Sequence, residues 1–133
     1  MYLFDTDVIT NILKKKAFSK LTDRLAPLSK SEQFISTITI FEIVYGAHRS
    51  SRKDFHLQNL EKILIPSVNI LTFDSRAAYV CGMLRARLEM EGQSIALVNL
   101  EIASIAVAND LILITGNIKH FERIKELKME NWL

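Results

Sequence analysis

Leu111-Ile-Leu-Ile-Thr-Gly-Asn117 determines the fold class that we predict for this chain. Its four apolar residues form an unbroken run, which is typical of a central strand buried on both faces of a sheet. Thr115, Gly116 and Asn117 are turn-forming residues that end the strand. A strand buried in this way belongs to a domain in which helices cover both faces of the sheet, so the run indicates an α/β fold.

Short apolar strands alternate with amphipathic helices over the rest of the chain. Strands are predicted at residues 2–4, 34–36, 68–71 and 111–114. Helices are predicted at residues 8–13, 18–28, 37–48, 52–65 and 74–91, with one more that begins at or next to Asn99. Because this alternation implies right-handed crossover connections, we expect a mostly parallel sheet. No linker or repeat interrupts the pattern, which predicts a single domain over residues 1–133.

The composition excludes several classes of protein. With 133 residues, 49% of them hydrophobic, the chain can build one core without disulfides or structural metals. The single cysteine cannot form an internal disulfide, and no cysteine–histidine cluster is present to bind zinc, which favours a reducing cytoplasm. The most apolar window, residues 92–118, is interrupted by Glu101 and Asp110, so it predicts a buried helix and strand rather than a membrane span. The net charge of +2 permits a polyanionic partner without requiring one.

Polar side chains follow the predicted strands at the positions where parallel sheets bind ligands, which are the carboxyl ends of the strands. The oxygen-bearing side chains at or near these ends are Asp5, Asp7, Ser36, Thr37, Glu42, Asn99, Thr115 and Asn117. Carboxylates gathered without thiols or histidines suit a hard cation such as Mg²⁺ or Mn²⁺. Such an ion activates a water molecule and neutralises charge on a phosphate, so the residues indicate hydrolysis of a phosphodiester.

Each of these residues also has a structural role that the sequence leaves open. Asp5 and Asp7 are suited to capping the helix that follows them. Glu42 is equally consistent with the solvent-facing side of an amphipathic helix. Asn99 is a good N-cap residue in its own right. The residues alone therefore reach an α/β domain with an acidic metal site, and they do not identify a substrate.

Several stretches together resemble the PIN-domain ribonucleases, and most specifically the VapC toxins of VapBC toxin–antitoxin pairs. They are Tyr2-Leu-Phe-Asp5-Thr-Asp7-Val8, Ile35-Ser-Thr-Ile-Thr-Ile-Phe-Glu42-Ile-Val-Tyr45-Gly46, and a run from Asn99 to Phe121 that is followed by Met129-Glu-Asn-Trp132. The resemblance covers nearly the whole chain, in order and at family spacing. It implies a PIN-like three-layer α/β/α domain with a central, mostly parallel sheet.

The resemblance also implies roles for individual residues. Asp5 and Glu42 match the first and second acidic metal ligands, and Asn99 occupies the position of the third, which is normally an aspartate. Asn117 matches the fourth catalytic position, where the family has an acid or an asparagine. Three further side chains are expected to contact these residues and hold them in place without being ligands themselves. They are Thr6, Asp7 and Thr115.

The implied activity is Mg²⁺- or Mn²⁺-dependent endonucleolytic cleavage of RNA, with a tRNA or an rRNA as the expected substrate. A cognate antitoxin is expected to block the site, and the toxin is expected to form a homodimer. Basic side chains are candidates for contacts with the RNA backbone. These candidates are Lys14, Lys15, Arg49, Arg52, Arg85 and Arg87.

Asn99 is the departure from the family pattern. Asparagine keeps a carbonyl oxygen but loses the charge and the second carboxylate oxygen, so metal affinity should fall. An engineered change, a degenerate natural chain, or an asparagine that suffices beside Asp7 would each account for it. Our hypothesis is that this chain is impaired relative to a version with aspartate at position 99.

Two other functions remain open from the sequence. One is a catalytically inactive PIN domain that only binds RNA or an antitoxin. The other is a haloacid-dehalogenase-like phosphatase with Asp5 as its nucleophile, because residues 4–8 and 111–115 also fit motifs of that family. Against the phosphatase, no acidic pair follows Thr115 to hold Mg²⁺, and Glu42 would have no role.

Overall fold

The apolar residues after Met1 form the central strand of the sheet. In the computed structural model, which describes residues 1–14 and 16–133, the strands are β1 (Tyr2–Phe4), β2 (Gln33–Ser36), β3 (Asn69–Leu71), β4 (Ile112–Ile114) and β5 (Lys128–Glu130). The described residues form one five-stranded sheet in the order β3-β2-β1-β4-β5. All neighbouring strands are parallel, as the sequence predicted, and Leu3 on β1 pairs with Phe34 on β2 and Leu113 on β4.

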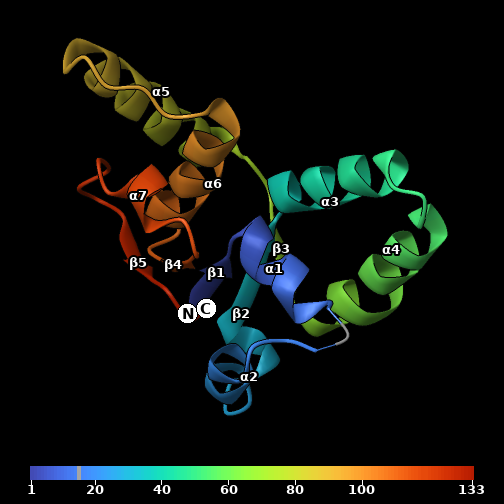
Figure 1. The fold of residues 1–133 in the computed structure, drawn as a ribbon. Helices are drawn as coiled ribbons and strands as arrows, with labels where there is room; N and C mark the ends of the chain where they lie inside the picture. The colour runs from blue at the N-terminus through green and yellow to red at the C-terminus, as the bar shows by residue number, and fades with distance from the viewer. Residues whose placement is uncertain (15) are drawn as a thin grey trace.

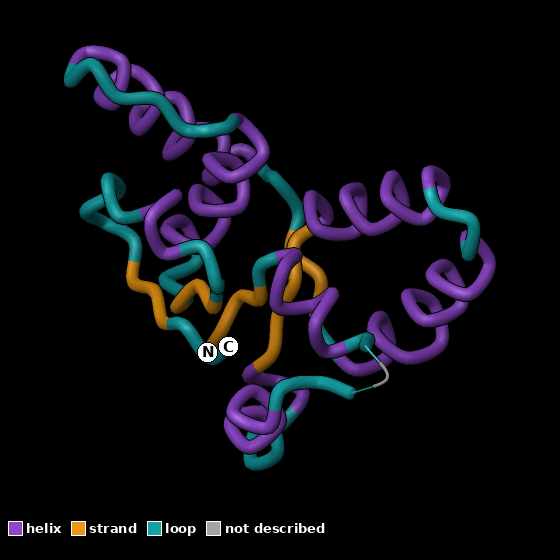
Figure 2. Tube along the Cα trace, in the orientation of Figure 1, coloured by secondary structure: helices purple, strands orange, loops and turns teal. Residues whose placement is uncertain are grey.

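Helices connect these strands and cover the sheet from both sides (Figure 1). The helices are α1 (Thr6–Ile12), α2 (Ser19–Leu25), α3 (Thr37–Arg49), α4 (Lys53–Asn59), α5 (Ser75–Met90), α6 (Leu97–Ala108) and α7 (Ile118–Phe121). Short helical turns η1 (Lys30–Glu32), η2 (Leu60–Leu64) and η3 (Ile65–Ser67) complete the connections. Figure 2 shows the strands gathered between two groups of helices, with α5, α6 and α7 in one group and α1, α3 and α4 in the other.

Two hydrophobic cores lie on the two faces of the sheet. Successive residues of a strand point to opposite faces, so each strand contributes to both cores. Leu3 and Leu113 pack with the buried residues of α5, α6 and α7. Phe4 and Ile114 pack on the other face with residues of α1, α2, α3 and η2. This arrangement is the three-layer α/β/α fold that the sequence predicted.

The most apolar window of the sequence forms a buried helix followed by a buried strand. Helix α6 is buried on all sides in its middle, from Ile102 to Ala106, because it lies between the sheet and neighbouring helices. Strand β4 follows it and buries Leu113 and Ile114 completely. None of the helices in the described part of the chain combines the length and the apolar character that a membrane span requires.

Several predicted elements differ from the structure. Helix α7 and strand β5 were not predicted from the sequence. Strand β5 is a three-residue edge strand, and its pattern is too short to be recognised without its partner β4. The helical segment predicted at residues 52–65 is present, but its hydrogen-bond pattern changes along its length, because α4 passes into a π-helical turn at Leu60–Leu64 and a 3-10 turn that contains Pro66.

Trp132 fixes the C-terminus of the chain against the sheet. Its side chain is buried, with 1% exposed. Its ring meets Tyr2 edge-on at 4.9 Å and Phe4 at 5.9 Å between centroids. The guanidinium of Arg24 stacks over the ring at 4.5 Å, and the indole nitrogen donates to Glu130 at 2.8 Å.

We expect Trp132→Ala to destabilise the protein by about 3–5 kcal/mol, because it removes a fully buried aromatic ring and leaves a cavity behind β1. Denaturant unfolding at neutral pH measures this loss. Met90→Ala is the control, because Met90 is 87% exposed at the end of α5 and its removal should change stability by less than about 0.5 kcal/mol. Equal losses for the two variants would contradict this role for Trp132.

Candidate active site

Asp5 stands where β1 ends and α1 begins, and only 5% of it is exposed. Its backbone N–H continues the sheet by donating to the carbonyl oxygen of Ile114 at 2.9 Å. Its Oδ1 accepts from the backbone N–H of Thr6 at 2.8 Å, so Asp5 does cap α1. Its Oδ2 accepts from the Thr115 hydroxyl, also at 2.8 Å. One carboxylate therefore joins the ends of two neighbouring strands to the start of a helix.

Glu42 lies beside this carboxylate because a hydrogen bond connects α3 to α1. The Thr6 hydroxyl donates to Glu42 Oε1 at 2.6 Å, although the two residues are 36 positions apart in the sequence. Thr39 contacts the same hydroxyl at 3.1 Å and is itself fully buried. Glu42 is therefore partly buried and hydrogen-bonded to α1, and it does more than face solvent on an amphipathic helix.

Ser36 and Thr39 support this arrangement from below. Ser36 is the N-cap of α3, and its hydroxyl accepts from the backbone N–H of Thr39 at 3.0 Å. Ser36 was predicted at the end of a strand, with the helix beginning at residue 37, and no role was predicted for Thr39. The spacing Ser36-x-x-Thr39 before Glu42 could have indicated this pair, because N-cap side chains bond to the third helical residue.

Asp7 binds the loop that follows β4. Its Oδ2 accepts from the backbone N–H of Gly116 at 2.9 Å and from the side-chain amide of Asn117 at 3.2 Å. Its Oδ1 is buried and has no hydrogen-bond partner among the described residues. A Cβ at Gly116 would lie 2.7 Å from Asp7 Oδ2 and 2.8 Å from Leu133 Cδ1, so a larger residue there would have to displace the Asp7 carboxylate and the Leu133 side chain. The predicted supporting residues Asp7 and Thr115 thus both hold site residues in place.

The raised pKa values of Asp5 and Asp7 show that negative charge is unfavourable at this edge of the sheet. Burial is the main cause that raises the pKa of Asp5 to about 6, and the nearby charges of Asp7 and Glu42 add to it, against the hydrogen bonds from Thr115 and Thr6. Burial also raises the pKa of Asp7, although the Gly116 N–H and the charge of His120 oppose this. A cation bound here would favour the charged forms of Asp5 and Asp7.

Asn99 does not cap a helix, contrary to the structural role that the sequence allowed. Helix α6 begins at Leu97, with Ala96 at its N-cap position, so Asn99 lies within the first turn. Its side chain is partly buried, and α6 packs against α3, the helix that carries Glu42. The capping prediction failed because the apolar residues Leu97 and Val98 already belong to the helix. The side-chain amide of Asn99 is therefore not needed for starting α6.

The donor set at this edge fits a hard cation. The hydrogen bonds gather carboxylates, hydroxyls and the Asn117 amide here, and their oxygen atoms are ligands that Mg²⁺ and Mn²⁺ prefer. The orphaned Oδ1 of Asp7 and the raised pKa of Asp5 are both features that a positive charge would relieve. No group of three histidine, cysteine, aspartate or glutamate side chains within ligand distance is found among residues 1–14 and 16–133. Two of the four expected site residues are asparagines, so an ion here would rely on amide oxygens as well.

A groove of about 940 Å³ opens beside the site. Its lining comes from α1, α3, α4 and η2, with Thr6 and Glu42 among the lining residues. Much of the lining is apolar, for example Ile43 and Phe55. The sequence did not predict this groove, because its walls are distant in the sequence and meet only in the folded chain.

Two of the basic candidates for RNA contact line the groove. Lys14 and Arg52 are lining residues, and Arg49 is the last residue of α3. Lys14 lies over the Phe18 ring at 5.9 Å and Arg52 over the Phe55 ring at 4.0 Å. Lys15 lies outside the described residues.

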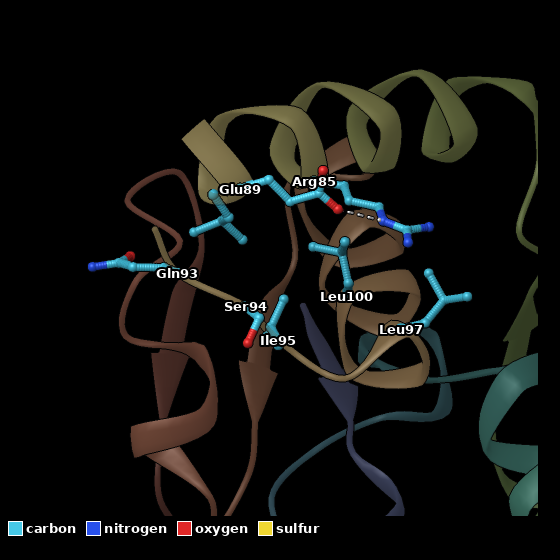
Figure 3. A pocket seen from close by; sticks show the side chains of 8 residues that line it. Arg85, Glu89, Gln93, Ser94, Ile95, Leu97 and Leu100 are labelled. Carbon is cyan, nitrogen blue, oxygen red and sulfur yellow. Dashed lines mark hydrogen bonds and ion pairs between the residues drawn. The ribbon is translucent and has the colours of Figure 1, made fainter. Parts of the chain in front are cut away.

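The other two basic candidates lie on α5, in the other group of helices. Arg85 points toward Glu89 at the wall of a smaller pocket of about 190 Å³, as Figure 3 shows, and pairs with it at 3.2 Å. Arg87 pairs with Glu126 at 2.8 Å. The structure therefore does not bring these two arginines to the acidic site, and their contact with RNA stays a prediction.

A family model described as the PIN domain matches residues 2–127 of the chain. The chain belongs to the PIN-domain family. Within the family it is similar to proteins named VapC. One is "Ribonuclease VapC2" of Rickettsia felis, which is 34% identical over 99% of this chain and 98% of that protein. Another is "tRNA(fMet)-specific endonuclease VapC" of Shigella flexneri, which is 30% identical over 98% of this chain and 97% of that protein.

The chain is also similar in structure to a VapBC complex that has been solved by crystallography. The crystal structure of VapBC2 from Rickettsia felis, bound to a DNA fragment from its promoter, contains a chain with a TM-score of 0.90 and 32% identity. The match covers 99% of this chain and 98% of that chain. The resemblance to VapC proteins that the sequence indicated is therefore confirmed, as is the PIN-like fold.

We expect Asp5→Asn to stabilise the metal-free PIN domain at pH 8. The pKa of Asp5 in the folded state is about 6, above the pKa of about 4 in an unfolded chain. The native state therefore binds more protons between these pH values, and the stability of the parent protein falls as the pH rises through this window. Removing the charge avoids this loss, which amounts to about 2–3 kcal/mol at pH 8.

Urea unfolding at pH 4 and pH 8 in the presence of a chelator measures the effect. The control is Asp74→Asn, since a hydrogen bond from the Ala77 N–H lowers the pKa of this exposed N-cap carboxyl. That variant should gain no stability at pH 8. Parallel pH–stability curves for the parent and Asp5→Asn would show that Asp5 does not carry this penalty.

Proposed function

We propose that this PIN domain is a Mg²⁺- or Mn²⁺-dependent endoribonuclease and the toxin of a VapBC-type pair. The observation that carries the proposal is the hydrogen-bond network in which Thr115 holds Asp5 and Thr6 holds Glu42. This network gathers two acidic side chains from distant parts of the chain at the carboxyl end of the central strand. The names of similar proteins, ribonuclease and tRNA-specific endonuclease, support RNA as the substrate.

Each site residue has a role in the proposed reaction. Asp5, Glu42 and Asn99 would hold the divalent ion, which when bound supplies an activated water and stabilises the leaving oxygen. Thr6 and Thr115 fix the orientation of the two carboxylates through their hydroxyls.

Asn117 and Asp7 complete the site beside these ligands. Asn117 donates through Nδ2 to Asp7, which leaves its amide oxygen available to accept a hydrogen bond from water. Asp7 in turn holds the loop that carries Asn117, because its Oδ2 also accepts from the backbone N–H of Gly116. We therefore assign Asp7 to positioning the loop and Asn117 to positioning the water.

We propose that Asn99 impairs this activity. An amide at this position supplies no negative charge, while Asp5 and Asp7 remain as buried acids that a cation has to stabilise. Because α6 starts without help from Asn99, an aspartate there would restore charge without altering the start of the helix. The fold tolerates either residue, so the difference should appear in metal binding and turnover.

We propose that the antitoxin occupies the groove between α1, α3 and α4. The similar structure from Rickettsia felis is a VapBC complex, which supports an antitoxin as partner. The groove has the apolar lining that an amphipathic peptide segment needs, and Glu42 lies at its wall. A segment bound there would cover the acidic site and prevent RNA from reaching it.

Other expectations stay predictions. These are the cytoplasmic location, the single-domain assignment over residues 1–133, and the alternative of a PIN domain that binds without cleaving. The phosphatase alternative left Glu42 without a role, whereas Glu42 has a defined place beside Asp5. The position of Glu42 and the membership of the PIN-domain family both favour the nuclease over the phosphatase.

The proposal predicts that purified chain carrying Asn99→Asp cleaves total bacterial RNA with Mg²⁺ or Mn²⁺ and not with a chelator. We expect the parent chain to cleave at least about tenfold more slowly and to bind Mn²⁺ at least about tenfold more weakly by calorimetry. Adding Asp5→Asn or Glu42→Gln to the Asn99→Asp chain should abolish both properties, because each removes a charged ligand.

Arg85→Gln in the Asn99→Asp background is the control, since its ion pair with Glu89 lies on α5. It should leave metal binding unchanged. If the Asn99→Asp chain binds Mn²⁺ but never cleaves RNA, the binding-only alternative replaces the nuclease. If the parent and the Asn99→Asp chain cleave equally well, Asn99 is a sufficient ligand and the impairment hypothesis is wrong.

The expected homodimer predicts a separate result. Tyr79 and Met83 lie one turn apart on the outer face of α5, with 85% and 54% exposed, and a second copy of the chain would cover them. We expect Tyr79→Glu to weaken self-association at least about tenfold in sedimentation velocity, because it places a charge in an apolar contact. Met90→Glu, at the end of the same helix, is the control. A parent chain that sediments as a monomer at all concentrations would contradict the homodimer.

A further inference from the structure

Helix α3 carries an exposed pair of aromatic side chains next to Glu42. Phe41 and Tyr45 are each 55% exposed, although aromatic rings of this size are usually buried. Their ring centroids are 6.2 Å apart, with planes inclined by 34°. The two residues are four positions apart and therefore lie one above the other on the helix surface. They form an aromatic surface that neither core of the domain uses.

Arg49 extends this surface and gives it a positive charge. Its guanidinium lies 5.5 Å from the centre of the Tyr45 ring, and its Nη1 donates to the Tyr45 hydroxyl at 3.1 Å. Within residues 1–14 and 16–133, Arg49 makes no ion pair. Two arginines of α5, in contrast, are paired with glutamates. The charge of Arg49 is therefore available to an anionic ligand.

The position of this surface relative to Glu42 follows from the geometry of the helix. Glu42, Tyr45 and Arg49 have the spacing i, i+3 and i+7, so they share one face of α3. Tyr45 is only about 4.5 Å further along the helix axis than Glu42. The groove lies on the other flank of Glu42, where Ile43 and Ala47 are lining residues. Glu42 thus stands between the groove and the aromatic surface.

We propose that Phe41, Tyr45 and Arg49 form a stacking site for an unpaired nucleobase of the RNA, next to the phosphate that the acidic site would cleave. Aromatic faces stack on bases of any sequence, and an arginine beside them binds the neighbouring phosphate. The inference rests on the proposed function and deepens it, because it requires a substrate with at least one unstacked nucleotide at the cleavage position. The unpaired charge of Arg49 favours a polyanion over an apolar partner on this surface.

The test measures binding of a fluorescein-labelled single-stranded oligouridine to the full chain by fluorescence anisotropy, in chelator so that no cleavage occurs. We expect Tyr45→Ala to weaken binding about tenfold and Tyr45→Phe to change it less than about twofold, because the phenylalanine ring still stacks. Phe41→Ala should also weaken binding, whereas Met90→Ala should not. Arg49→Gln should reduce the salt dependence of binding by about one unit of slope, while Tyr45→Ala leaves the slope unchanged.

Two further measurements distinguish base stacking from a contact between two copies of the chain and from a general loss of RNA binding. A labelled RNA duplex of the same length should bind equally to the parent and to Tyr45→Ala, since its bases are already stacked. Sedimentation velocity should give the same oligomeric state for both proteins. A Tyr45→Ala protein that dissociates to monomers would overturn the inference and assign the surface to a second copy of the chain.

The outcome for stacking is distinct from the outcome for cleavage. If Tyr45→Ala and the parent bind the oligouridine equally, or if the parent does not bind it, the stacking site is wrong, whatever the cleavage assay shows. If Tyr45→Ala loses binding but the Asn99→Asp chain never cleaves RNA, the stacking site remains and the nuclease proposal is wrong. Tyr45→Ala introduced into a cleaving Asn99→Asp chain should raise KM more than it lowers kcat, because Tyr45 binds substrate without touching the reacting atoms.

Discussion

The buried carboxylate of Asp5 is the interaction on which the site depends. It caps α1 through the Thr6 N–H and accepts from the Thr115 hydroxyl, so one side chain connects the ends of β1 and β4 to the first helix. Thr6 then extends the network to Glu42 on α3. Because these bonds join groups that burial has largely removed from water, losing one leaves an unsatisfied polar atom and disturbs its neighbours.

This network gathers negative charge in a place where charge is unfavourable. Burial raises the pKa of Asp5, and two neighbouring acids add to the effect. In the absence of a cation, the ionised Asp5 carboxylate lowers the stability of the fold above pH 6, and a bound divalent ion would reverse that loss. The proposed role of Asn99 as a ligand belongs in this context, because an amide supplies no negative charge to attract the ion.

Helix α3 has several roles at once, and its periodicity keeps them apart. Ile43 and Ala47 face the interior, Glu42 faces the acidic site, and Phe41 and Tyr45 face solvent on the opposite flank from the groove. Because residues three and four positions apart share a face, a thirteen-residue helix has room for a core side, a site side and a binding side. The proposed antitoxin contact therefore lies on one side of Glu42, and the proposed RNA contact lies on the other.

The sequence by itself determined the α/β class, the parallel sheet and the positions of Asp5 and Asn117, because apolar runs and strand-end residues are local signals. It also identified Glu42 and Asn99, although their roles as ligands came only through the resemblance to PIN domains. The tertiary structure alone decided that Glu42 is bound to Thr6, that β5 exists as a partner of β4, and that a groove adjoins the site. The physical reason is that these features are made by residues far apart in the chain, whose contacts form only when the whole sheet and its helices have packed.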